Sequence, residues 1–83
     1  MDVNELGDLR PEVREFALAM ERRLRANDHK PGWKDADPDW LYLRLLEQKK
    51  QLEQALRWQQ KPLLTVAATD LANFAMMIAD VAG

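Results

Sequence analysis

The chain contains no cysteine and no serine, and only 3 glycines among its 83 residues. Without cysteine it cannot form disulfides, thiolate metal sites or thiol nucleophiles, and a cytoplasmic protein is the simplest interpretation. Without serine it cannot carry a Ser-His-Asp triad. Gly7, Gly32 and Gly83 are too far apart to form a glycine-rich phosphate loop. The acidic N-terminal residues 1–5 lack a signal sequence, which again favours the cytoplasm.

Neither charge sign dominates the composition. The 12 Lys and Arg residues against 14 Asp and Glu residues give a net charge of -2. A chain without a basic field is poorly suited to bind a phosphate backbone, so we expect no DNA or RNA partner. The length fits one domain over residues 1–83. A domain this small buries only about 60–65% of its unfolded surface, so we expect it to self-associate.

Apolar residues recur at helical spacing in three segments, and no segment alternates as a strand would. The sequence therefore predicts an all-α fold, a bundle of three main helices. We expect one helix from just after the N-cap Asp8 to Asn27, one from Pro38 behind the N-cap Asp37 to about Gln59, and one over Leu63–Val81. The long connection between the first two is too rich in turn formers to be helical.

The first predicted helix carries an apolar stripe that we expect to face the core. Its members are spaced by three and four: Val13, Phe16, Ala17, Met20 and Leu24. The arginines of its last turns complement the helix dipole, and we expect Arg22, Arg23 and Arg25 to form a solvated face. The alternative is that they bind an anion.

The third predicted helix is apolar almost all round, which is typical of a helix buried in an oligomeric bundle or in a lipid bilayer. Its length would span the hydrocarbon core. Asp70 near its centre would cost about 2.5–3.5 kcal/mol there, and Asn73 would add to this cost. We therefore expect no membrane span.

Asp70 needs a partner, because a carboxylate on a helix with little polar surface is costly when unpaired. One interpretation is a Mg²⁺ or Mn²⁺ site with oxygen ligands from Asp70, Glu47 and Gln51. The other is a hydrogen bond across the bundle to Tyr42, Trp58 or a threonine. Spacing alone does not decide between them.

Three stretches carry a family resemblance: NDHKPGWKD at residues 27–35, LLEQKKQLEQAL at 45–56 and DLANFAMMIAD at 70–80. In these stretches the chain resembles the MazG-like all-α nucleoside triphosphate pyrophosphohydrolases, particularly their short phage and prophage members. The resemblance covers roughly residues 13 to 82. It implies a homo-oligomer, either a dimer or a dimer of dimers, with sites built between chains.

Members of this family cleave a nucleoside or deoxynucleoside triphosphate into the monophosphate and pyrophosphate. Their Mg²⁺ ions are held by a Glu-Glu-x-x-Glu motif on one helix and a Glu-x-x-Asp motif on the next. The resemblance places the first motif on Glu47, Gln48 and Gln51, and the second on Ala67 and Asp70. Only Glu47 and Asp70 keep a carboxylate, so three of the five expected anionic ligands are missing.

This loss predicts weak metal binding and little or no hydrolysis, because the site lacks the negative charge that holds hard divalent cations. We assign no catalytic residue, and any cofactor would be Mg²⁺ or Mn²⁺ or none at all. The resemblance also implies residual nucleotide binding through Lys30, Trp33, Lys34 and Asn73. Two alternatives stay open: a still active Mg-dependent pyrophosphohydrolase, and a non-enzymatic helical dimer that binds a partner protein.

Overall fold

The computed structural model describes residues 3–83, and in this range every regular element is a helix. The elements are α1 (Val3–Gly7), α2 (Pro11–Ala26), α3 (Pro38–Arg57) and α4 (Lys61–Ala82). The predicted all-α class is confirmed, and so are the three main helices, α2, α3 and α4.

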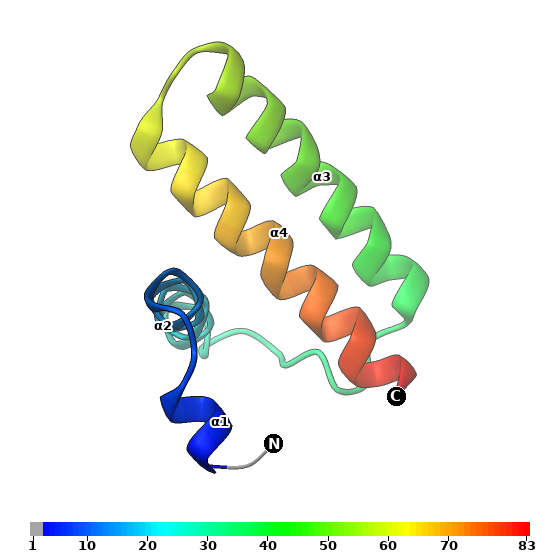
Figure 1. Cartoon of the computed structure of the whole chain (residues 1–83). Coiled ribbons are helices and arrows are strands. Elements are labelled where there is room, and N and C mark those ends of the chain that lie inside the picture. Colours follow the sequence, from blue (N-terminus) through cyan, green and yellow to red (C-terminus); the bar gives the residue numbers. More distant parts are fainter. Residues whose placement is uncertain (1–2) are drawn as a thin grey trace.

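Helices α3 and α4 form an antiparallel hairpin. Helix α2 crosses this hairpin on the side formed by α4 (Figure 1). α4 packs along the length of α3 and over a shorter stretch against α2. Figure 1 views α2 nearly end-on while α3 and α4 lie across the picture, so α2 crosses α4 at a steep angle. The connection after α2 runs to the start of α3, beside the C-terminal end of α4 (Figure 1).

Local sequence sets the ends of α3. Asp37 is the N-cap as predicted, with Oδ1 accepting from the backbone N–H of Asp39 at 2.8 Å, and Pro38 opens the helix. At the other end, Gln60 N–H donates to the carbonyl of Ala55 at 3.0 Å, and Gln59 N–H to that of Leu56 at 3.3 Å. These bonds form a Schellman motif. Gln59 occupies its left-handed position at φ 52°, which usually holds glycine.

The start of the first main helix differs from the prediction. Arg10, not Asp8, is the N-cap of α2, and its side chain makes no capping bond. Asp8 instead follows the short helix α1, which the sequence pattern did not predict, and its N–H donates to the carbonyl of Glu5 at 3.2 Å. Arg14 holds this connection, since its Nη2 donates to the carbonyl of Leu9 at 2.9 Å.

The core is thin. Among the described residues, the buried ones are Leu41, Ala55, Ala67, Thr69 and Asn73. The predicted α2 stripe reaches the core only at its C-terminal end, where Met20 and Leu24 are half-buried. Val13, Phe16 and Ala17 are exposed, because α2 crosses α4 instead of running along it. Much of the apolar surface of this chain therefore has no partner within the chain.

Candidate functional site

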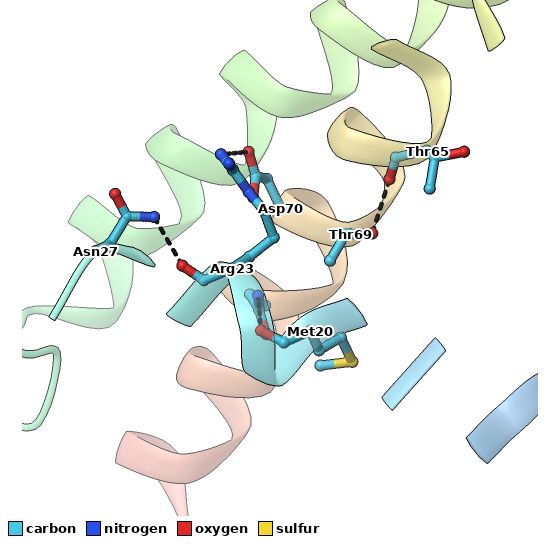
Figure 2. A network of polar contacts seen from close by, with 7 residues as sticks. Met20, Arg23, Asn27, Thr65, Thr69 and Asp70 are labelled. Carbon is cyan, nitrogen blue, oxygen red and sulfur yellow. Dashed lines mark hydrogen bonds and ion pairs between the residues drawn. The ribbon is translucent and has the colours of Figure 1, made fainter. Parts of the chain in front are cut away.

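Two polar contacts fix the crossing of α2 over α4 (Figure 2). Arg23 donates from Nε to Oδ1 of Asp70 and from Nη2 to Oδ2, both at 2.9 Å. Asn73 donates from Nδ2 to the backbone carbonyl of Met20 at 3.1 Å. Each helix contributes two positions three residues apart, so both contacts lie on facing sides of the helices. The pair of contacts sets the register of α2 on α4.

The partner of the Asp70 carboxylate is the guanidinium of Arg23. The bond is bidentate and partly buried, with side-chain exposures of 40% for Arg23 and 18% for Asp70. The side-chain hydrogen bond with Asp70 raises the pKa of Arg23, so the guanidinium stays charged. The prediction that Asp70 needs a partner is confirmed, whereas the proposed Tyr42, Trp58 or threonine partner is wrong.

The interpretation of Arg23 as part of a solvated face is also wrong. A signal in the sequence could have corrected it, because position 23 is three residues after Met20 and seven after Phe16. Helical periodicity places it on the same face as the apolar stripe. An arginine on that face pairs with the one acid near the middle of α4.

A groove of about 700 Å³ opens beside this ion pair. It is lined by charged, aromatic and amide side chains from α2, the connection after it, α3 and α4, including Arg23, Lys30, Trp33, Trp40, Arg44, Gln48, Asp70 and Asn73. Three of the four residues expected to contact nucleotide, Lys30, Trp33 and Asn73, therefore come together. Lys34 does not line the groove.

Lys34 instead anchors the connection between α2 and α3 to the end of α4. Its Nζ donates to Oδ2 of Asp80 at 2.6 Å, and the indole Nε1 of Trp33 donates to the same oxygen at 2.9 Å. The hydrogen bond from Lys34, and after it the bond from Trp33, lower the pKa of the Asp80 carboxyl. This contact holds Trp33 at the mouth of the groove, with the Lys34 ammonium 5.4 Å from the centre of its ring.

The three positions that the resemblance assigns to lost carboxylates lie together between α3 and α4. Gln48, Gln51 and Ala67 line a second hollow of about 380 Å³, and every other residue of its lining is also uncharged. Gln48 lines both hollows, so they adjoin one another. Glu47 lines neither hollow, and its Oε2 lies 2.9 Å from Nη1 of Arg44 in an ion pair on the exposed side of α3.

These residues do not fit a divalent cation. Mg²⁺ and Mn²⁺ prefer anionic oxygen ligands in near-octahedral geometry. Both remaining carboxylates, Glu47 and Asp70, are engaged by arginines. Over residues 3–83, no three Asp, Glu, His or Cys side chains gather where they could hold a metal ion.

Asn73 is almost fully buried, with 4% of its surface exposed, and its amide is only half satisfied. Nδ2 bonds to Met20, but the buried Oδ1 has no hydrogen-bond partner among the described residues. An unpaired buried acceptor costs about 1–3 kcal/mol. Asn73 and Asp70 both belong to the lining of the groove.

The chain matches no family model, no curated protein and no solved structure.

Proposed function

We propose that this chain is a nucleotide-binding helical domain of the MazG-like type, homo-oligomeric, whose pyrophosphohydrolase activity is impaired or lost. The observation that carries the proposal is the state of the two remaining carboxylates at the five ligand positions. Arg23 holds Asp70 through a bidentate, partly buried bond, and Glu47 lines neither the groove nor the second hollow. A carboxylate held by an arginine is a poor ligand for a hard cation, because the cation must displace the guanidinium.

The groove supports a nucleotide as the ligand. Its volume of about 700 Å³ lies within the range of about 300–1,000 Å³ that is usual for small-molecule sites. Three of its lining residues, Arg23, Lys30 and Arg44, supply positive charge for phosphates. Trp33 and Trp40 supply ring faces on which a base could stack.

The exposed area supports self-association. The chain exposes 6703 Å², whereas a compact monomer of 9.6 kDa exposes about 5,100 Å². The radius of gyration is 13.9 Å, against about 12 Å for a compact chain of this length. If each protomer covered the excess of about 1,600 Å², a dimer would bury about 3,200 Å² in total, which is typical of obligate homodimers.

The distribution of apolar surface favours the same conclusion. By length and composition α4 could cross a membrane, since an 18-residue stretch of it has a mean hydropathy of 1.4. Only 17% of that stretch is buried within the chain. Leu43 and Leu56 on α3, and Trp58 directly after it, are 59–69% exposed. We propose that a second copy covers these surfaces rather than lipid, because the Arg23–Asp70 ion pair would be costly in the hydrocarbon core.

The proposed loss of catalysis is tested by pyrophosphate release. The purified protein is incubated with the common NTPs and dNTPs in Mg²⁺ or Mn²⁺, and we expect little or no release. A variant with Gln48→Glu, Gln51→Glu and Ala67→Glu restores the missing carboxylates, and it should release more. Ala26→Glu, which adds a carboxylate at an exposed site at the end of α2 that lines neither hollow, is the matched control and should not. Robust turnover by the unmodified chain would contradict the proposed impairment.

A second candidate is a non-enzymatic helical dimer that binds a partner protein. The exposed aromatics of α3 favour it, since Trp40, Tyr42 and Trp58 are 53–69% exposed. Pull-down from a lysate with and without nucleotide tests this candidate. Recovery of the chain alone, with these aromatics covered by self-association, would argue against it.

A further inference from the structure

The ion pair at the crossing of α2 and α4 leaves several N–H donors of Arg23 unused. A guanidinium carries five N–H donors. Arg23 uses one on Nε and one on Nη2 for Asp70, which leaves three. Because 40% of the side chain is exposed and Arg23 lines the groove, these remaining donors are available to a ligand there.

We infer that the Arg23 guanidinium, held by Asp70 in the groove, binds the phosphates of a nucleotide without any divalent cation. The inference rests on the proposed nucleotide-binding function and adds the means of anion recognition. In this role Asp70 is a positioning residue, since its bidentate bond fixes the plane of the guanidinium.

Charge around the groove agrees with a metal-free site. Three cations, Arg23, Lys30 and Arg44, line it against two carboxylates, Asp28 and Asp70, and Arg44 also pairs with Glu47 outside the lining. Lys30 forms no ion pair with any residue between positions 3 and 83 whose contacts the structure describes, so its ammonium is available to a second phosphate. The Lys30 ammonium attracts a free polyphosphate more strongly than it attracts a polyphosphate whose charge Mg²⁺ has partly neutralised.

The buried amide of Asn73 is the second observation that points to a ligand. It lines the same groove, it is 4% exposed, and its Oδ1 lacks a partner. Phosphate oxygens cannot satisfy this acceptor, but a sugar hydroxyl or a base N–H can. The site therefore has donors for an anion at Arg23 and an acceptor for the neutral part of the same molecule at Asn73.

The test is calorimetric titration of the full chain with dATP and dTTP, first in EDTA and then in Mg²⁺. Inorganic tripolyphosphate serves as the probe for anion recognition alone. We expect binding in EDTA that is at least as tight as in Mg²⁺, and weaker binding of tripolyphosphate. Arg23→Met should raise the dissociation constant in EDTA by about tenfold or more. Arg22→Met, an exposed arginine on the same helix outside the groove, is the matched control and should change it little.

Asp70→Asn separates the two ways of binding. If Asp70 only positions Arg23, nucleotide binding in EDTA persists, because the asparagine side-chain oxygen can still accept from Arg23 while a neighbouring negative charge is removed. If Asp70 is a metal ligand, binding requires Mg²⁺ and is lost in this variant. The second result would overturn the inference and leave the proposed nucleotide binding standing. No binding of any nucleotide in either buffer, by a chain with intact helical circular dichroism, would overturn both.

Discussion

The ion pair between Arg23 and Asp70 should stabilise the contact between α2 and α4 measurably. Its two bonds of 2.9 Å are aligned for bidentate pairing, and Asp70 is only 18% exposed. Arg23 is 40% exposed, so solvent screens the interaction and the value for a fully buried pair does not apply. We expect a coupling energy of about 1–2 kcal/mol, above the usual value for exposed pairs of about 0.2–1 kcal/mol.

A double-mutant cycle with Arg23→Met and Asp70→Leu measures this coupling by urea unfolding. Arg23→Met alone should lower the free energy of unfolding by about 2 kcal/mol. This loss is larger than the coupling energy because the variant leaves the Asp70 carboxylate half-desolvated and unpaired. In thermal unfolding each kcal/mol corresponds to about 4–8 °C for a domain of this size. Protomer concentration is kept constant, since self-association contributes to apparent stability. Additive single substitutions, with a coupling near zero, would refute the argument.

Three further predictions concern the helix ends and the loop anchor. Asp37→Ala should lower the free energy of unfolding by about 1 kcal/mol by removing the N-cap of α3, and urea unfolding with no change would contradict the capping role. Gln59→Gly should raise that free energy by about 0.5–1 kcal/mol, because glycine adopts the left-handed φ of 52° without a steric cost, whereas a loss of stability would contradict the Schellman geometry. The lowered pKa of Asp80 means that its bonds to Trp33 and Lys34 stabilise the fold above about pH 4 and cease to do so as the pH falls through that lowered pKa. Asp80→Asn should therefore lower the melting temperature at pH 7, and this difference should shrink as the pH falls through that lowered pKa, whereas a difference that does not change with pH would contradict the assignment.

The sequence predicted the helices well where local chemistry decides them. Asp37 before Pro38 carries its own capping group, and the apolar residues of α3 and α4 repeat at helical spacing. The start of α2 was missed because Asp8 is a good capping residue by type, while the chain caps there with Arg10 and no side-chain bond. Residue preference is a weak guide when several nearby positions could end a turn.

The candidate site was predicted only in part, because its contacts depend on how α2 crosses α4. Lys30, Trp33 and Asn73 come together in the groove, as do Gln48 and Asp70. The pairing of Asp70 with Arg23 joins positions 47 residues apart, and helical periodicity indicates only that Arg23 shares a face with the apolar stripe, not which acid it contacts. The engagement of Glu47 by Arg44, in contrast, is a contact at a spacing of three that helix geometry alone favours.

The most direct test of nucleotide binding in the groove uses the three tryptophan indole N–H signals in ¹H–¹⁵N NMR spectra. Trp33 and Trp40 line the groove, whereas Trp58 lies at the other end of α3 and does not line it. On titration with dATP in EDTA, we expect the signals of Trp33 and Trp40 and the side-chain amide of Asn73 to shift together, while Trp58 stays unchanged. Shifts confined to Trp58, or equal at all three indoles, would contradict binding in this groove.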